Sequence, residues 1–195
     1  MSDPLFEDDD AATPLTPDEK QGLIPSYITL RRELNEAEHI GIMAAEKWAF
    51  SRKRDVLDEK FLRQLHQRMF KDVWRWAGEF RTTPRNIGVE PWCITTMLRN
   101  LIEDVRYWVL HDIYAPDEIT VRFHHRLVFI HPFPNGNGRH ARLAADLLLV
   151  KLGQECFTWG RLSLLSAGET RNKYVTALRV ADAHNIQALL EFVRT

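Results

Sequence analysis

Two strongly helical stretches of this chain are separated by twelve residues, His131-Pro132-Phe133-Pro134-Asn135-Gly136-Asn137-Gly138-Arg139-His140-Ala141-Arg142. Pro132 and Pro134 interrupt any helix there, because proline lacks a backbone N–H and clashes with the preceding turn. Gly136 and Gly138 allow backbone conformations that other residues resist, and they let a ligand approach the main chain. The segment is therefore predicted to be a loop that ends where the next helix begins.

The same loop combines the residue types of an anion-binding site. It would open a helix, whose N-terminus presents free N–H groups and the positive end of a dipole to phosphate. Arg139 and Arg142 add permanent positive charge in a fork geometry that suits phosphate oxygens. His131 precedes the loop, where a general base would lie close to a bound phosphate. A glycine-rich turn with solvated arginines is the ordinary alternative, but the combined spacing favours phosphoryl or nucleotidyl transfer.

Helical periodicity dominates the rest of the chain. Thr16-Pro17-Asp18-Glu19 has the cap, the first-position proline and the capping box of a helix start. Longer helices are expected at about residues 30–50, 58–73, 97–109, 116–130, 143–152, 169–181 and 185–193. Periodicity disappears only in residues 82–93, which suit a short hairpin or an extended loop. The predicted fold is all-α, with a short β-hairpin as its one non-helical feature.

Composition suggests three parts and an intracellular setting. Residues 1–15 read as a flexible acidic tail, residues 16–50 as an N-terminal helical region and residues 51–195 as the core domain. The formal net charge of -1 gives no general attraction to nucleic acid or anionic lipid, so neither is expected as a partner. The start lacks the features of a signal peptide, and the two cysteines suit reduced thiols. A cytoplasmic protein is predicted.

Three further histidines near the loop, His124, His125 and His140, are candidate metal ligands. His124 and His125 are adjacent on a predicted helix and point about 100° apart, so they do not readily face one ion. No cysteine or glutamate stands nearby at zinc-site spacing. His124 is therefore expected to be a helix residue near the site, and His125 and His140 ordinary polar positions. Trp92 is a candidate contact for a partner.

The loop resembles the signature of the Fic family, which reads His, any, Phe, any, Asp or Glu, Gly, Asn, Gly, Arg, any, any, Arg. Every position matches except the acid, which is Asn135 here. The resemblance covers most of residues 23–193 and includes Leu65, His66, Met69, Phe70, Trp76, Ala77, Gly78, Arg81, Arg171, Tyr174, Ala177 and Leu178. The opening segments 15–19, 22–25 and 33–36 resemble the branch called mobile mystery protein B.

The resemblance implies a protein adenylyltransferase, which moves AMP from ATP to a Ser, Thr or Tyr hydroxyl of a target protein with Mg²⁺ or Mn²⁺. His131 would be the catalytic base. Gly136, Asn137 and Gly138 would hold the α- and β-phosphates, with Arg139 steadying them. Arg142 would contact the distal phosphate. Asn135 occupies the metal-ligand position, where it offers a neutral oxygen in place of a carboxylate.

Two further features follow from the same resemblance. The non-helical segment would be a flap that docks the target by strand-like pairing, through Thr82, Thr83, Arg85, Asn86, Ile87, Gly88 and Val89. Thr29-Leu30-Arg31-Arg32-Glu33 matches the first five positions of an inhibitory helix motif, and Leu34 departs from the sixth. Glu33 would then pair with Arg142 and block the distal phosphate; the alternative is a solvated helix residue.

The sequence leaves other functions open. A Fic enzyme could transfer a different phosphate-containing group, such as phosphate, UMP or phosphocholine. A degenerate domain could bind a nucleotide or a partner without turnover, and Asn135 keeps that alternative alive. The resemblance also implies a homodimer and a companion protein, mobile mystery protein A.

Overall fold

The computed structural model describes residues 15–162 and 166–195, and the chain in these ranges is helical. The predicted acidic tail therefore lies, apart from Leu15, outside the described residues. The elements are α1 (Pro17–Lys20), α2 (Arg31–Phe50), α3 (Glu59–Phe70), a 3₁₀ turn (Pro91–Cys93), α4 (Ile94–Leu110), α5 (Pro116–Ile130), α6 (Asn137–Lys151), α7 (Ala167–Asp182) and α8 (Gln187–Val193). The all-α class is confirmed. None of the described helices is long and apolar enough to cross a membrane.

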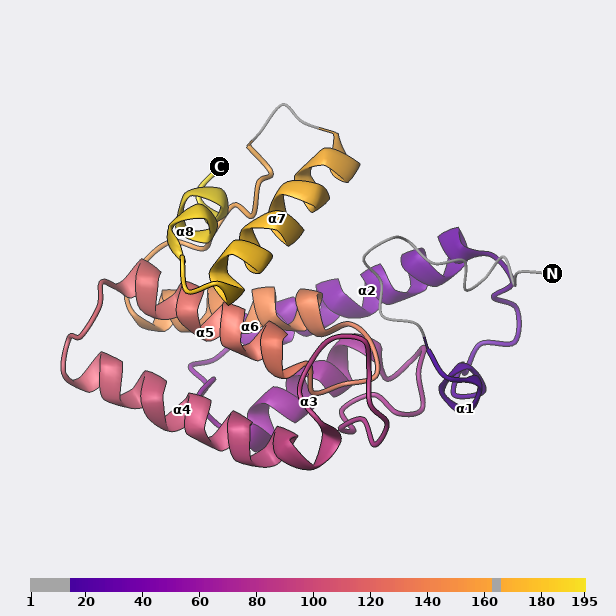
Figure 1. Ribbon diagram of the computed structural model, residues 1–195. Coiled ribbons are helices and arrows are strands. Elements are labelled where there is room, and N and C mark those ends of the chain that lie inside the picture. Colours follow the sequence, from indigo (N-terminus) through magenta and orange to yellow (C-terminus); the bar gives the residue numbers. More distant parts are fainter. Residues whose placement is uncertain (1–14, 163–165) are drawn as a thin grey trace.

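The pair α5 and α6 forms the centre of the molecule (Figure 1). Helix α4 packs on α5, α2 packs on α3, and α3 lies against α6. Helices α7 and α8 pack together and lie beside one end of the central pair. The loop between α5 and α6 therefore sits in the middle of the fold, where side chains from several helices can reach it.

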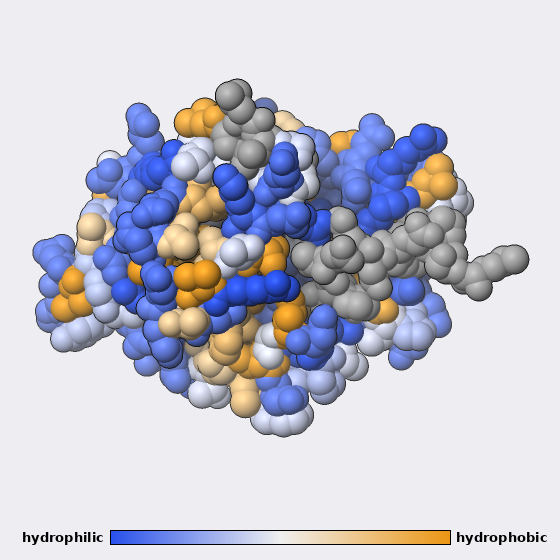
Figure 2. Space-filling view, turned by 45° about the horizontal axis from the view of Figure 1, so that its top comes forward, coloured by the Kyte–Doolittle hydropathy of each residue, from blue (hydrophilic) through white to orange (hydrophobic). Residues whose placement is uncertain are grey.

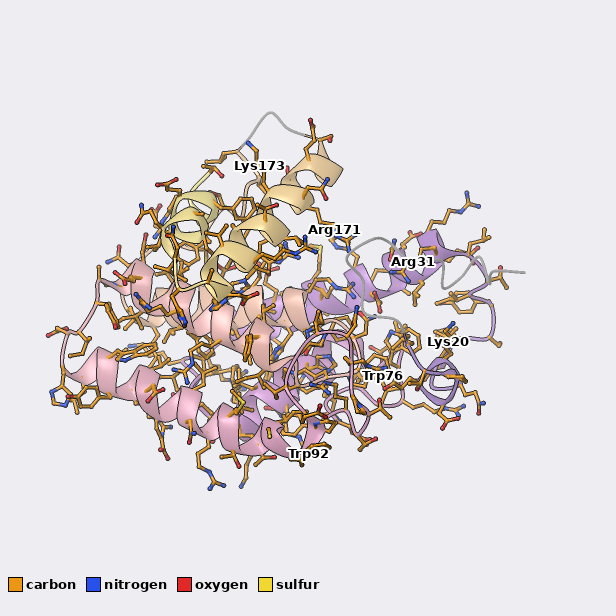
Figure 3. The ribbon with its side chains drawn as sticks, viewed as in Figure 1. Lys20, Arg31, Trp76, Trp92, Arg171 and Lys173 are labelled. Atoms are coloured by element: carbon orange, nitrogen blue, oxygen red, sulfur yellow. The ribbon has the colours of Figure 1, made fainter. Side chains whose placement is uncertain are left out.

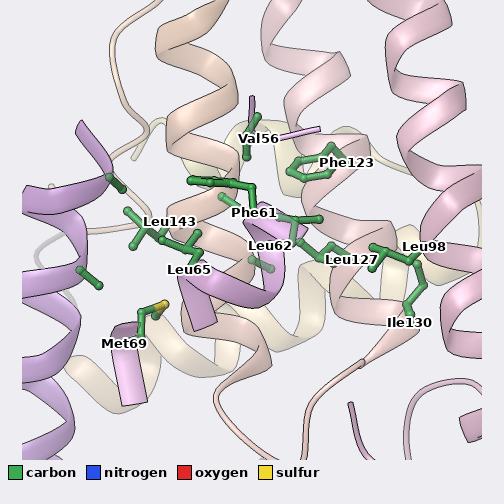
Figure 4. Close-up of a cluster of buried hydrophobic side chains, with 14 of the residues drawn as sticks. Val56, Phe61, Leu62, Leu65, Met69, Leu98, Phe123, Leu127, Ile130 and Leu143 are labelled. Atoms are coloured by element: carbon green, nitrogen blue, oxygen red, sulfur yellow. The ribbon is translucent and has the colours of Figure 1, made fainter. Parts of the chain in front are cut away.

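Two clusters of buried side chains hold these layers together. The larger one joins α3 to α4, α5 and α6 through Leu62, Leu65, Leu98, Phe123, Leu127 and Leu143 (Figure 4). The smaller one joins α7 and α8 to α6 through Ala177, Ala181, Leu189 and Leu149, with Phe157 and Trp159 of the loop after α6. Burial of such side chains is the main favourable term in folding. The surface carries mainly hydrophilic residues, with a hydrophobic patch near the middle of the face in Figure 2.

Local signals start and stop most helices near the expected residues, but α6 begins at Asn137, six residues before the expected residue 143. Thr16 and Glu19 form the expected capping box of α1, and the Asp58 carboxylate accepts a 2.8 Å hydrogen bond from Phe61 N at the start of α3. Helix α6 ends at Lys151, where Gly153 has a φ of 80°. Helix α3 ends at Phe70, a few residues earlier than expected, and the next turn pairs with the N-terminal segment through Ile24 N and Val73 O.

The β-hairpin expected in residues 82–93 is not formed. Residues 79–90 contain no strand, and the described residues hold only one isolated bridge, between Leu23 and Trp74. The segment is instead an irregular loop, with bends at Thr83 and at residues 86–88. The Arg81 guanidinium donates hydrogen bonds to the carbonyl oxygens of Thr83 and Val89. A side chain closes this loop where a ladder of backbone bonds would close a hairpin.

Helices α2 and α3 approach so closely that one position tolerates no side chain. A Cβ added at Gly41 would collide with the carbonyl oxygen of Met69, which is backbone and cannot rotate away. Gly168 on α7 offers a matched comparison, because no atom of the described residues lies within 4 Å of a Cβ placed there.

We predict that Gly41→Ala lowers the free energy of unfolding by about 1–3 kcal/mol, the usual cost of overpacking. Gly168→Ala should leave it unchanged or raise it by up to about 1 kcal/mol, because alanine favours helix over glycine. Urea unfolding followed by circular dichroism measures both. Equal stability of the two variants would show that α2 and α3 are not in this close contact.

Candidate active site

The loop between α5 and α6 is closed by the side chain of Asn137. Its Oδ1 accepts a 2.9 Å hydrogen bond from Phe133 N, and its Nδ2 donates one of 2.8 Å to Phe133 O. Both residues are buried, and the Phe133 ring lies wholly in the core. The Asn137 side chain is therefore committed to the loop, so it could contact a phosphate only through its backbone N–H.

A buried histidine on α3 supports the loop from below. The His66 ring stacks on Phe133 with 3.7 Å between ring centroids. Its Nδ1 accepts a hydrogen bond from Gly78 N at 2.9 Å, so Nε2 carries the proton and donates to Asn135 O at 3.0 Å. Gly136, with a φ of 78°, fits closely over Phe70, since an added Cβ would lie 2.6 Å from that ring. Helix α3 thus sets the shape of the loop.

The first turn of α6 is open to a ligand at Gly138. Among the described residues, a Cβ added there would meet only the Tyr174 hydroxyl, at 3.8 Å. Since a helix N-terminus attracts anions through its N–H groups and dipole, this turn can receive a phosphate.

The two loop arginines have different surroundings. Arg139 Nη1 donates to Glu38 Oε2 at 2.7 Å, and the buried Glu38 carboxylate also accepts a 2.7 Å bond from Trp74 Nε1. Arg142 lies over the Tyr174 ring and has no ion-pair partner in the part of the chain that the structure describes. Of the two, Arg142 is the cation whose charge is available to a ligand.

The sequence prediction for Glu33 is wrong in its geometry. Glu33 accepts hydrogen bonds from Thr29 N and Leu30 N, at 2.9 and 3.0 Å, and so caps the start of its own helix. These bonds lower the pKa of its carboxyl group. It does not pair with Arg142. The carboxylate of α2 that reaches the loop is that of Glu38. Glu38 lies one turn after the buried Leu34 on the same face of the helix, and a charged residue on this apolar face was the sequence signal for its role.

His131 ends α5 in the left-handed conformation, with a φ of 53°. Its side chain is 6% exposed, and burial lowers the pKa of the imidazole to about 4, with smaller contributions in the same direction from Arg81 and Arg85. Arg81 Nε also donates a 2.7 Å bond to the His131 carbonyl oxygen. At neutral pH the ring is uncharged, and an uncharged imidazole can accept a proton.

The flap segment lies against His131. A Cβ at Gly88, where φ is 93°, would come within 2.6 Å of the His131 Cβ. Thr82, Asn86, Ile87 and Gly88 are exposed, whereas Thr83 and Val89 are half-buried. Arg85 differs from the expectation for a docking residue, because its side chain is 5% exposed and is ion-paired with Glu19 of α1.

The residues near Asn135 do not form a divalent-cation site by themselves. Asn135 Oδ1 is a neutral oxygen and already accepts a hydrogen bond from Gly136 N at 2.6 Å. No group of three His, Cys, Asp or Glu side chains in the described residues could hold a metal ion.

The three histidines that were candidate metal ligands, His124, His125 and His140, form hydrogen bonds within the protein. His124 is buried and bonds the Tyr174 hydroxyl at 2.9 Å, and His125 bonds Asp182 at 2.8 Å. His140 is fully buried and bonds Leu62 O at 2.9 Å, so its expected place as an ordinary polar position is wrong.

The fold and the loop define a class of all-α domain in which two central helices are joined by a His-Phe-Gly-Asn-Gly-Arg segment. Residues 56–149 match the sequence model of the Fic/DOC family, and structures of Fic domains share the fold, as described below. The chain therefore matches the Fic/DOC family over residues 56–149, and it has the fold of Fic domains.

Curated relatives have one activity in their names. Protein adenylyltransferase fic-1 of Caenorhabditis elegans is 27% identical over 83% of this chain and 32% of its own length. Protein adenylyltransferase Fic of Aedes aegypti is 27% identical over 80% of this chain and 31% of its own length. A probable protein adenylyltransferase of Aquifex aeolicus (strain VF5) is 26% identical over 69% and 40%. The chain thus spans about a third of the length of these relatives.

Solved structures share the fold at low sequence identity. BepC, a VirB-translocated effector protein of Bartonella tribocorum crystallised with bound AMPPNP, has a TM-score of 0.70 at 17% identity, covering 92% of this chain and 97% of that one. A fragment of Fic-1 from Caenorhabditis elegans has a TM-score of 0.67 at 24% identity, covering 90% and 51%.

The buried histidines predict how stability depends on pH. Burial lowers the pKa of His124 to about 3, of His131 and His140 to about 4, and of His66 well below its usual value. Between pH 6.5 and about 4 the unfolded chain therefore binds protons that the folded chain does not, and stability falls as pH falls. Asp146 opposes this, because burial raises its pKa to about 6.

The four histidines together outweigh the single carboxyl group of Asp146. Each proton that the unfolded chain binds and the folded chain does not changes the free energy of unfolding by about 1.4 kcal/mol per pH unit. We therefore predict a lower free energy of unfolding at pH 5.5 than at pH 7.5, measured by urea titration at both values. An equal or higher value at pH 5.5 would mean that these rings are not buried and neutral.

Proposed function

We propose that the domain is a protein adenylyltransferase, which transfers AMP from ATP to a Ser, Thr or Tyr hydroxyl of a target protein. The observation that carries the proposal is a buried, neutral His131 one loop away from the N-terminus of α6, where Gly138 leaves room for a ligand. The names of the curated relatives support the same activity. The AMPPNP bound to BepC supports ATP as the donor.

In the proposed reaction, the His131 imidazole accepts the proton of the target hydroxyl as its oxygen attacks the α-phosphorus. The bond from that phosphorus to the β-phosphate oxygen breaks, and pyrophosphate leaves. Negative charge on the α-phosphate oxygens would be stabilised by the N–H groups of the first turn of α6 and by Arg139. Arg142 would face the leaving pyrophosphate. Mg²⁺ or Mn²⁺ would be held mainly by the nucleotide's own phosphates, since Asn135 offers no charge.

We predict that His131→Ala lowers the transfer rate by about 10²–10⁴-fold while ATP still binds. His39→Ala, at an exposed position of α2, is the matched control and should keep the wild-type rate. The measurement is incorporation of label from ATP into protein, with binding followed by calorimetry. Wild-type transfer by His131→Ala would exclude this histidine as the base.

The position of the label separates the proposal from its alternatives. Incorporation from α-labelled but not γ-labelled ATP indicates AMP transfer, and the reverse indicates phosphate transfer. Labelled UTP and CDP-choline in parallel test transfer of UMP and phosphocholine. Tight nucleotide binding with no incorporation from any donor would favour a binding module and would contradict the proposed activity.

A restraint by α2 on this site would act through Glu38. Its carboxylate pairs with Arg139 and places a negative charge beside the proposed phosphate position, where it opposes an anionic ligand. Glu33, by contrast, is bonded to its own helix start.

We predict that Glu38→Gln tightens ATP binding by roughly thirtyfold, because one like charge at about 8 Å from a phosphate is worth about 2 kcal/mol at an effective dielectric constant of 20. Glutamine keeps an acceptor for Trp74, so the packing should survive. Glu33→Gln is the matched control and should leave the dissociation constant within about twofold. Unchanged or weaker ATP binding in Glu38→Gln would refute the restraint.

A further inference from the structure

Helix α1 carries a carboxylate that is held in a fixed position. Glu19 N bonds Thr16 Oγ1 at 3.3 Å, and Glu19 Oε2 accepts a 2.8 Å bond from Thr16 N. This capping box folds the side chain back along its own turn and leaves the carboxylate 13% exposed. Glu19 therefore does not behave as a mobile surface residue.

The segment that contains Glu19 is fastened to the turn after α3. Trp76 Nε1 donates to Glu19 O at 3.0 Å, and two backbone bonds of 2.9 Å join Arg75 N to Gly22 O and Ile24 N to Val73 O. Figure 3 labels Trp76 and Lys20, the neighbour of Glu19, on this side of the molecule. The carboxylate is thus fixed relative to the core as well as to its own helix.

Glu19 meets the flap at Arg85. The two side chains form an ion pair with 13% and 5% exposure, so neither charge is well solvated. Arg85 Nε is buried and has no hydrogen-bond partner, so Glu19 provides the main compensation for the guanidinium. A buried charge that loses its partner is strongly disfavoured, so without Glu19 the Arg85 side chain should leave this position.

The flap has one other anchor, at its base. Arg81 donates to Thr83 O and Val89 O within the flap and to His131 O beneath it. Val89 N also donates to Ile130 O, at 3.4 Å. Between these anchors the backbone bends at Asn86, Ile87 and Gly88, which are exposed and belong to no sheet. The conformation of the exposed part therefore depends on Arg81 at one side and on Arg85 at the other.

We propose that Glu19 is a positioning residue for target docking, which holds the flap in its observed conformation beside His131 through Arg85. The role rests on the proposed transfer to a protein hydroxyl, because the exposed flap residues 86–88, whose backbone groups form no backbone hydrogen bond within the described residues, can pair with a target segment. A flap that is already ordered loses less conformational entropy when the target docks. Glu19 then affects recognition of the target protein and leaves nucleotide binding alone.

The test compares Glu19→Gln with Asp18→Asn, which removes a carboxylate from an exposed position of the same helix. Glutamine can still complete a capping box, so α1 should persist. Backbone hydrogen exchange is measured in the full-length protein without nucleotide. We expect residues 85–89 to exchange at least tenfold faster in Glu19→Gln and at the wild-type rate in Asp18→Asn, with the amides of α4 and α5 unchanged in both.

A second measurement follows label transfer from α-labelled ATP to a His131→Ala copy of the chain as the acceptor protein. Glu19→Gln should raise the acceptor KM at least fivefold, with kcat and the ATP dissociation constant within about twofold of wild type. Arg85→Met should have the same effect, and the double variant should be no worse than either single one, because both remove one interaction.

Unchanged flap exchange in Glu19→Gln would overturn the proposal. So would a change in ATP binding as large as the change in acceptor KM. The exchange experiment needs no transfer activity. Faster hydrogen exchange of the flap in Glu19→Gln, in a protein that transfers no AMP, would support the positioning of the flap by Glu19 and reject only the proposed function.

Discussion

The two hydrogen bonds between the Asn137 side chain and the main chain of Phe133 are the constraint on which the site depends. They close the loop into a turn, so that α5 can end at His131 and α6 can begin only a few residues later. The Phe133 ring then fills the core between His66 and His140. Because these bonds are buried, losing either one would leave an unsatisfied polar group, which is costly. The distance from His131 to the first turn of α6 is fixed by this turn.

The support beneath the loop is unusually polar for a core. His66, His140 and Arg81 are almost completely buried, and each bonds a main-chain carbonyl of Asn135, Leu62 or His131. Such groups stabilise little compared with apolar packing, but they are satisfied in only one arrangement. They therefore define where the backbone lies, and the apolar clusters supply the stability. A site that must hold a general base at a fixed distance from a phosphate benefits when polar contacts define the backbone position and apolar packing supplies the stability.

The sequence predicted the parts of this structure that depend on neighbouring residues. Helix α1 with its capping box and the break in helical periodicity that begins at His131 follow from local patterns, although α6 begins at Asn137, inside the segment expected to be a loop. What it missed depends on pairs far apart in the chain. Arg139 meets Glu38 across 101 positions, and Arg85 meets Glu19 across 66. A motif match at Glu33 could not reveal that Glu38, one turn further along, faces the loop.

The charges around the site have a common arrangement. Two carboxylates of the N-terminal region each pair with an arginine beside the candidate site. Glu38 pairs with Arg139 of α6, and Glu19 pairs with Arg85 of the flap. Both pairs hold a loop in place, and both reduce the charge that the arginine can offer to a ligand. Arg142 has no such partner among the described residues, so its charge acts undiminished on the open turn of α6. A polyphosphate bound there would be drawn toward Arg142, because His131 is uncharged and Arg85 and Arg139 are already paired. The positions of two acids outside the loop thus give the site a direction that the loop residues alone do not.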